Sequence, residues 1–257
     1  MSSIWMHGGR GLRRPPFYRA IHSVPYILLV MATLASGLVA ARRSRAANEI
    51  AGKAEKVTGT VILGDDRRLN AGDLIFAMDR ISTGKDGSAE IVFIDGSRMK
   101  LAAETSLKIT AYKFDPKEKI RYGIVWLSFG KVRFAVLELD DFNDRRFRVQ
   151  TETAVAGSLD TDFIVAYERE IQRDEICRNG LTTALCIENS IILSSTGFQD
   201  KPTSLSSYML SQVCGAGLPT PPRFITSAEL ARISTGLEQI GARKISFPWD
   251  LRNPAVY

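Results

Sequence analysis

Histidine is nearly absent from this 257-residue chain. The two that it has, His7 and His22, lie close to the start, so the sequence beyond residue 22 carries no imidazole. Mechanisms in which a histidine activates a serine or a cysteine are thereby excluded from that part, as are histidine metal sites. The chain also lacks a P-loop and a Gly-x-Gly-x-x-Gly motif after a strand. We therefore expect no catalytic residue, no cofactor and no metal, and a protein that is not an enzyme.

Acidic residues are absent from positions 1–46, where seven arginines stand. Without this segment the chain has 27 basic residues against 28 acidic ones, so its net charge falls from +6 to −1. The remaining sequence has no long basic run and no basic stripe interleaved with aromatic residues. Such features mark nucleic-acid-binding proteins, so we expect no nucleic-acid partner. The basic excess therefore lies in residues 1–46, which we interpret as a targeting segment.

Residues 24–40 form an apolar run of 17 residues without a charge, with arginines before it and small residues after it. A basic region, an apolar run and a small-residue cleavage site together predict a secretory signal peptide. Ser44-Arg45-Ala46 fits the cleavage site. We expect residues 1–46 to be removed and the body to be periplasmic. The alternative is an uncleaved anchor that holds the protein on the inner membrane, facing the periplasm.

Only three cysteines are present, at positions 177, 186 and 214, and their spacing fits no metal motif. Export would place them in an oxidising compartment, where disulfides persist. Cys177 and Cys186 flank the turn-forming residues 178–181, which favours a bridge between them across a hairpin. Three cysteines permit three single pairings, so Cys214 stays unassigned.

Long helical patterns are missing between residues 57 and 167, and short apolar runs separated by turn residues take their place. This pattern predicts an all-β fold, an antiparallel β-sandwich or β-roll of many short strands. We expect a linker at 47–56, the main β domain at 57–170 and a β-hairpin extension of the same domain at 171–217. Residues 57–63 are expected to form one strand, and a further hairpin is expected to turn at Asn189.

Asp95 and Gly96 join two alternating apolar runs, residues 89–94 and 98–101. An Asp-Gly pair in this position predicts a hairpin, and a type I′ turn would place both residues at positive φ.

A Pro-rich linker, an amphipathic helix and a tail are expected over residues 218–257. Thr226 and Glu229 have the spacing of a capping box, which predicts the start of the helix. Leu230, Ile233, Leu237 and Ile240 would share one face and end at Gly241. Such a face most often packs on its own domain, and a partner interface is the alternative.

Several of these segments, taken in order, resemble the FecR domain family. The resemblance covers about residues 57–167 and rests on these stretches: Gly59-Thr60-Val61, Leu69 to Asp73, Ile81 to Gly84, Ala89 to Ser97, Val125 to Phe134, Phe147 to Thr151, Ala154 to Gly157 and Thr161 to Phe163. It singles out Asp95, Gly96, Gly157, Asp160 and Thr161 as the family-motif turn residues. Asp160 stands where the family usually has glycine. Gly157 and its alanine neighbours are interpreted as small residues that let chain segments approach closely, with a ligand groove as the alternative.

The resemblance implies an all-β periplasmic domain that relays a signal from a receptor to a cytoplasmic anti-sigma segment on the same chain. About two dozen residues precede the apolar run, too few for a folded cytoplasmic domain, so that role is not carried over. We expect a non-enzymatic interaction or scaffolding module, with envelope sensing or signalling as a candidate role and an envelope protein or a cell-wall polymer as partner. A membrane-anchored signalling protein is the alternative if the leader is retained.

Paired carboxylates offer another alternative, a cell-wall or carbohydrate-active enzyme. Such an enzyme needs two acidic side chains about 5–10 Å apart in a cleft. The candidates are Asp65, Asp66, Asp140, Asp141 and Asp144. Arginines adjoin each group in the sequence, so local pairing in solvated loops is the simpler interpretation.

The leader gives the first prediction. Cells that express the chain are fractionated, and the N-terminus of the recovered protein is sequenced. We expect a periplasmic protein that starts near Ala47. A full-length protein in the inner-membrane fraction would contradict cleavage and support the anchored alternative.

Overall fold

The computed structural model describes residues 49–158, 160–169, 177 and 179–237. All of them belong to the second of two compact units, residues 46–257. The predicted leader and residues 238–257, with Ile240 and Gly241, lie outside the described residues. Within the described part, no helix has the length and apolar character needed to cross a membrane.

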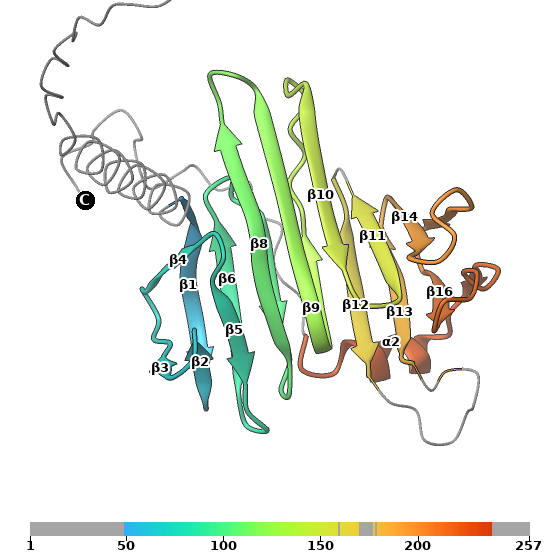
Figure 1. The fold of residues 1–257 in the computed structure, drawn as a ribbon, viewed down its shortest axis with the longest axis horizontal. Helices are drawn as coiled ribbons and strands as arrows, with labels where there is room; N and C mark the ends of the chain where they lie inside the picture. Colours follow the sequence, from blue (N-terminus) through green and yellow to red (C-terminus); the bar gives the residue numbers. More distant parts are fainter. Residues whose placement is uncertain (1–48, 159, 170–176, 178, 238–257) are drawn as a thin grey trace, which may run out of the picture. The chain divides into compact units, whose positions relative to one another are not determined.

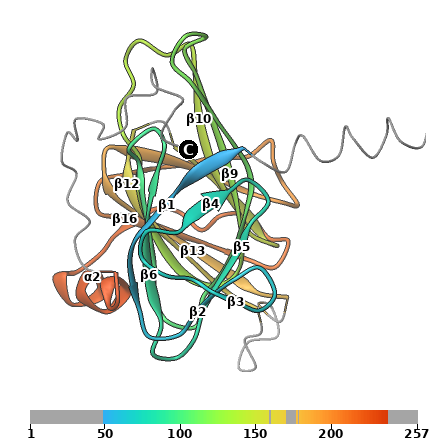
Figure 2. The same ribbon diagram turned by 90° about the vertical axis from the view of Figure 1, so that its left-hand side faces the viewer.

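Strands dominate the structure and form two layers that share one long strand, β9 (Ile120–Ala135) (Figures 1 and 2). Sheet A contains, from edge to edge, β4 (Leu74–Phe76), β1 (Ile50–Thr58), β6 (Ser88–Phe93), β7 (Arg98–Leu101), β9, β12 (Asp162–Glu168), β13 (Leu181–Glu188), β16 (Met209–Cys214) and β17 (Arg223–Phe224). Sheet B contains β3 (Arg67–Arg68), β2 (Val61–Leu63), β5 (Arg80–Thr83), β8 (Ser106–Asp115), β9, β10 (Asp144–Gln150), β11 (Ala154–Ser158), β14 (Ser190–Ser195) and β15 (Thr203–Ser206). The expected all-β fold of sandwich or roll type, with one short C-terminal helix, is confirmed.

Strand β9 belongs to both sheets because it bends at Gly130. Its first part pairs with β8 and β10 in sheet B, and its last part pairs with β7 and β12 in sheet A. Gly130 has a φ of 95°, and a Cβ there would lie 2.5 Å from Cα of Thr105. Only glycine meets both conditions without strain. After β9 ends in sheet A, the chain crosses to sheet B. There β10 pairs in parallel with the first part of β9.

Other passages between the sheets also turn at single residues with positive φ. Gly59 (64°) separates β1 from β2, and Asn189 (63°) separates β13 from β14. Met78 (74°), Glu104 (50°) and Tyr208 (62°) do the same between β4 and β5, β7 and β8, and β15 and β16. Side chains other than glycine rarely adopt this conformation, so the packing on both sides must hold it.

Two expectations fail at these passages. Residues 57–63 are not one strand, because β1 ends at Thr58 in sheet A and β2 begins at Val61 in sheet B. The hairpin predicted at Asn189 does not exist either, since β13 pairs with β12 and β16 whereas β14 pairs with β11 and β15.

The linker expected at 47–56 is wrong from Ile50 onward, where β1 begins. Ala51 and Ala54 are fully buried, and β1 pairs with both β4 and β6. The sequence hides this strand because its inward positions carry alanine rather than large β-branched residues, which weakens the alternating pattern.

The hairpin at Asp95-Gly96 is confirmed, but its turn is not type I′. The amide of Gly96 donates to the carbonyl of Phe93 at 2.9 Å, and the amide of Phe93 donates to the carbonyl of Ser97 at 2.8 Å. Gly96 has a φ of 86°, whereas Asp95 does not enter the left-handed region. This is a three-residue loop, a type I turn followed by a left-handed glycine.

The main core lies between the sheets and is built around aromatic rings from both. Phe93 stacks on Tyr112 with ring centroids 4.6 Å apart, and Phe134 lies 5.3 Å from both Phe147 and Phe163. All five side chains are essentially buried. Aromatic contacts of this kind add to the stability that burial of their area provides.

A second apolar cluster lies where the C-terminal segment packs on sheet A. Helix α2 (Ser227–Ser234) begins with the predicted capping box between Thr226 and Glu229. Arg223 and the Thr226 amide hold the pKa of Glu229 at about 2. The helix is shorter than expected, because it ends before Gly236, whose φ is 77°. The cluster contains these residues: Ala102, Ile164, Leu185, Leu210 and Leu237, with Ile187, Ile225, Leu230 and Ile233 against them. The apolar face of this segment therefore packs on its own domain.

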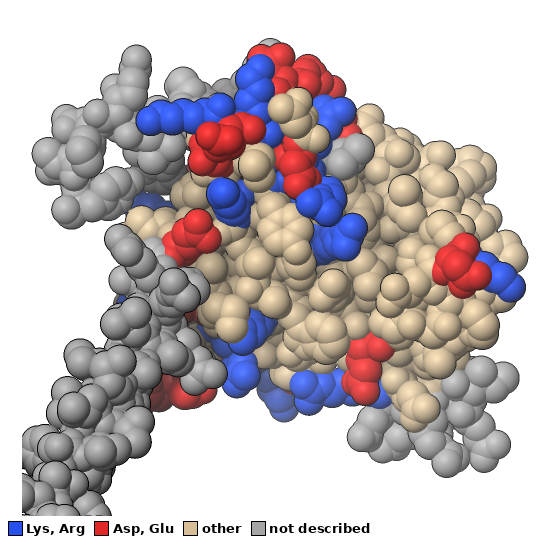
Figure 3. Space-filling model, turned by 45° about the horizontal axis from the view of Figure 1, so that its top comes forward, with Lys and Arg blue, Asp and Glu red and all other residues tan. Residues whose placement is uncertain are grey.

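Charge is unevenly spread over the strand stack. From residue 179 to residue 222 the chain carries only Glu188, Asp200 and Lys201 as charged residues. Figure 3 shows the consequence: charged side chains gather over the left and upper part of the view, and the right-hand part, where Figure 1 places the C-terminal strands, shows few.

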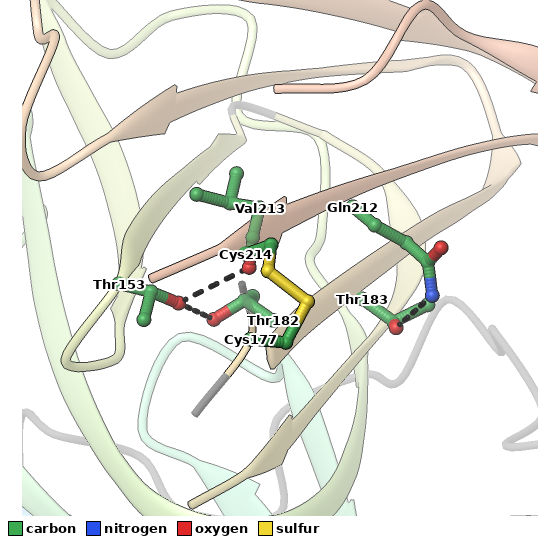
Figure 4. Close-up of a disulfide and its surroundings, with 7 residues drawn as sticks. All are labelled: Thr153, Cys177, Thr182, Thr183, Gln212, Val213 and Cys214. Atoms are coloured by element: carbon green, nitrogen blue, oxygen red, sulfur yellow. Dashed lines mark hydrogen bonds between the residues drawn. A yellow bond between two sulfur atoms is a disulfide. The ribbon is translucent and has the colours of Figure 1, made fainter. Parts of the chain in front are cut away.

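The disulfide joins Cys177 to Cys214, not to Cys186 as expected (Figure 4). Cys177 precedes β13 and Cys186 lies near its far end, five positions beyond Leu181, or about 17 Å of strand. Antiparallel β16 instead brings Cys214 opposite Leu181. The two Cα atoms are 4.8 Å apart.

Hydroxyl groups line the neighbourhood of this bridge. The Oγ1 atoms of Thr153 and Thr182 are 2.6 Å apart, and Thr153 donates to the carbonyl of Val213 at 3.5 Å. Cys186 is buried, and burial raises the pKa of its thiol to about 11. A thiol that keeps its proton is a poor nucleophile, so Cys186 is expected to be inert.

The disulfide gives the second prediction. It closes a sequence separation of 37 residues. Its removal by a Cys177→Ala/Cys214→Ala double variant is expected to lower the free energy of unfolding by about 3–4 kcal/mol. Urea unfolding measures the loss, and Cys186→Ala under the same conditions is the single-cysteine control. Peptide mapping that finds Cys186 in a disulfide of the native protein would contradict the assignment.

Candidate functional site

The family-motif turn residues lie close together at one end of the two-layered structure, around two shallow cavities. A cavity of about 180 Å³ is lined by Gly96, Asp160 and Thr161, among others. A second, of about 250 Å³, is lined by Gly157 and again by Asp160. Asp95 lies behind the first cavity and is fully buried. The structure therefore brings these five residues into one region, although β6–β7 and β11–β12 are far apart in the sequence.

Asp95 has a structural role in this region. Its two carboxylate oxygens accept hydrogen bonds from the backbone amide of Ser97 at 2.9 Å and from the Ser97 hydroxyl at 2.8 Å. That hydroxyl in turn accepts from the amide of Leu137 at 3.0 Å. The carboxylate thus closes the hairpin turn and connects it to the segment that follows β9.

Arg121 pairs with this carboxylate in the interior, and both side chains have an exposed fraction of 0%. Its Nη1 lies 3.3 Å from Asp95 and donates to the carbonyl of Leu137 at 2.9 Å, while its Nη2 donates to the carbonyl of Arg145 at 2.8 Å. Burial and the Asp95 carboxylate raise the pKa of Tyr112 well above its usual value. A buried charge with this many partners costs much to disturb.

A second ion pair fixes the other motif turn and the C-terminal segment. Arg133 holds Asp162 with two hydrogen bonds, of 2.8 and 2.6 Å, and donates a third to the carbonyl of Leu237 at 3.2 Å. The Thr161 hydroxyl donates to the carbonyl of Ser190 at 2.9 Å. The hydrogen bonds of Asp95 and Thr161 connect separate segments of the chain, so these two motif residues stabilise the fold.

Gly157 differs from the other motif residues, and the close-approach interpretation fails for it. A Cβ on Gly157 would meet only the carbonyl oxygen of Ile192, at 3.9 Å, which is an ordinary contact. Gly157 leaves an opening on the outer face of sheet B, opposite Arg148 on one side and Ile192 on the other. This opening belongs to the larger of the two cavities.

The acidic side chains of this region interact with an arginine or with one another. Asp162 is engaged by Arg133. A hydrogen bond with Asp140 and repulsion by Asp140 and Asp160 raise the pKa of Glu138. Among the described residues, no three His, Cys, Asp or Glu side chains gather as a metal site requires.

Three of the five carboxylates proposed from the sequence, Asp65, Asp140 and Asp144, lie within 4.0 Å of an arginine. Asp140 and Asp144 pair with Arg145 and Arg146, at 3.8 and 2.5 Å. The carboxylate of Asp65 lies 4.0 Å from Arg80. Its partner is therefore not one of the nearby arginines in the sequence, Arg67 or Arg68. Pairing with arginine therefore describes Asp65, Asp140 and Asp144.

Comparison with known proteins supports one family. Residues 79–176 match the family described as FecR protein. Two crystal structures of a protein described as a "putative anti-sigma factor" from Parabacteroides distasonis are similar, each with 18% identity and with TM-scores of 0.44 and 0.43. The alignment covers 59% of this chain and 62% of theirs, so the chain spans about three fifths of their length. No curated protein matches the sequence.

The buried ion pair gives the third prediction. Asp95→Asn removes a charge next to buried Arg121 and is expected to lower the free energy of unfolding by about 3–5 kcal/mol, because Arg121 keeps its charge in the interior. Asp144→Asn breaks an exposed pair with Arg146 and is expected to cost less than about 1 kcal/mol. Urea unfolding of both variants measures the difference. Equal losses would contradict the role assigned to Asp95.

Proposed function

Because residues 79–176 of this chain are a FecR domain, we propose that the protein is a non-enzymatic signalling module that acts in the periplasm. We further propose that it binds an envelope protein by strand addition at β15. The leader pattern and the disulfide support a location outside the cytoplasm. The observation that carries the mode of binding is the open, uncharged edge of sheet B at β15.

The four sheet edges differ in how they are protected. At the N-terminal end, β3 has two residues and both are arginines, and β4 has three residues. At the C-terminal end, β17 and Thr220 cover β16: the Thr220 hydroxyl accepts from the amide of Gln212 at 2.9 Å, and the Thr220 amide donates to the carbonyl of Gln212 at 2.8 Å. Short, charged or covered edges resist pairing with other chains.

Strand β15, with four residues, has neither a charged side chain nor a covering strand in the described part of the chain. It pairs with β14 on one side, and within the described residues no strand pairs with its other side. Its sequence is Thr-Ser-Leu-Ser, without charge or proline. Leu205 is buried while Ser204 and Ser206 are exposed, so the strand keeps the alternation that an added strand needs.

The surface around β15 is poor in charge and rich in exposed apolar side chains. Of the seven large apolar residues that are exposed in the described part, five lie between residues 192 and 224: Ile192, Phe198, Tyr208, Leu218 and Phe224. Phe224 is 69% exposed and stands opposite Met209 in the pairing of β16 and β17. Exposed aromatic side chains next to an open strand edge are typical of protein-binding surfaces.

Strand addition gives the fourth prediction. A photo-crosslinking amino acid is placed at residue 204 in β15 and, as a control on another edge of the same sheet, at residue 68 in β3. We expect residue 204, and not residue 68, to crosslink one discrete envelope protein in cells. Hydrogen exchange with that purified partner should then slow the amides of residues 203–206.

Either of two results would contradict the proposal. Crosslinks that form equally from both positions would show no preference for the open edge. A bound partner that leaves the amides of β15 unprotected would show that binding occurs elsewhere.

A further inference from the structure

Sheet B presents cations and aromatic rings side by side on its outer face. Six residues, here called the basic face, make up this surface: Lys108, Lys113, Tyr122, Trp126, Arg146 and Arg148. In register, Lys108 pairs with Trp126, Lys113 with Tyr122, and Tyr122 with Arg146. The residues between them on the same strands, such as Leu107, Val125 and Phe147, are buried. Alternation therefore directs all six outward.

The cations of the basic face have few internal partners. Arg146 pairs with Asp144 and lies 5.4 Å over the Tyr122 ring. Lys108 and Arg148 form no ion pair with any described residue. In β8, β9 and β10 the only acidic side chains are Asp115 and Asp144, at the ends of their strands. The face is thus locally basic on a body that, beyond residue 46, has a net charge of −1.

An opening next to Arg148 makes room for a bound group. Gly157 lies between Arg148 and Ile192 in the register of β10, β11 and β14. Because it has no side chain, a cavity of about 250 Å³ remains, lined also by Arg146 and the hydroxyl-bearing Ser190. The cavity combines the Arg148 guanidinium, an apolar wall and a hydroxyl group, and the Asp160 carboxylate also lies in its lining. A single ring with a carboxylate fits this combination.

We propose that the basic face binds an acidic polysaccharide whose sugar rings carry carboxylates. Trp126, 39% exposed, offers a flat apolar surface for a sugar ring. Arg148 matches a carboxylate with two parallel hydrogen bonds, and Lys108 supplies a second charge. This binding is independent of strand addition at β15.

The spacing of the cations favours a sparsely charged polymer over a nucleic acid. Lys108 on β8 and Arg148 on β10 are two strands apart, about 10 Å. Nucleic acids carry closely spaced phosphates, and proteins that bind them neutralise many at once. Three cations without an ion pair to a described residue, Lys108, Lys113 and Arg148, and one paired arginine on a nearly neutral body suit occasional carboxylates instead.

Calorimetry with the full chain and purified polygalacturonate, a uronic acid polymer, tests the proposal. We expect saturable binding that weakens as salt is added, since charge pairs on a surface are screened. Arg148→Gln should weaken binding about tenfold, the usual effect of losing a hydrogen bond to a charged group. Trp126→Ala should weaken it as well. Lys56→Gln, the same charge change on β1 of sheet A, should leave it unchanged.

A Gly157→Val variant separates binding from folding. Valine is favoured in strands and its Cβ has room here, so its unfolding midpoint should match the native protein while binding is lost. The proposal is overturned if polygalacturonate does not bind, or if its methyl-esterified form binds equally well. It is also overturned if Arg148→Gln and Gly157→Val bind as the native chain does, or if single-stranded DNA binds more tightly to the same face.

Discussion

The buried pair between Arg121 and Asp95 is the contact on which the rest of the strand stack depends. Arg121 stands at the start of β9, and its guanidinium reaches the turn of β6–β7, the carbonyl of Leu137 and the carbonyl of Arg145. Leu137 and Arg145 lie at the two ends of the crossing from sheet A to sheet B. One buried side chain therefore fixes where the chain leaves one sheet and where it enters the other. The parallel pairing of β9 with β10 follows from that placement.

The pair also explains why Asp95 is a poor candidate for a binding residue. A carboxylate and a guanidinium in the interior must have their hydrogen bonds satisfied by the protein itself, because burial without partners costs several kcal/mol. The carboxylate oxygens of Asp95 accept hydrogen bonds from Ser97 and pair with Arg121, and those of Asp162 pair with Arg133. Residues held in this way define the shape of the surface. The residues free to bind a partner are their neighbours on the outer faces and edges.

Two surfaces remain available once the motif residues are accounted for, and their chemistry differs. The C-terminal end, with β15, Tyr208 and Phe224, is poor in charge and suits a backbone partner. The middle of sheet B, with Lys108, Trp126 and Arg148, is basic and aromatic and suits an anionic sugar chain. A module with both surfaces could join a protein and a polymer of the envelope. This arrangement agrees with a scaffolding or sensing role and needs no catalytic group.

The sequence by itself determined the local structure. Short alternating runs predicted strands, Asp95-Gly96 predicted a hairpin, and Thr226 with Glu229 predicted the start of α2, because these patterns depend on neighbouring residues alone. The assignment of strands to sheets was decided by the tertiary structure. It depends on corners at which Met78, Glu104 and Tyr208 hold a positive φ that their side chains do not favour. Only long-range packing can hold such corners, and the same packing brings Cys214 to Cys177 and aligns Lys113, Tyr122 and Arg146 across three strands.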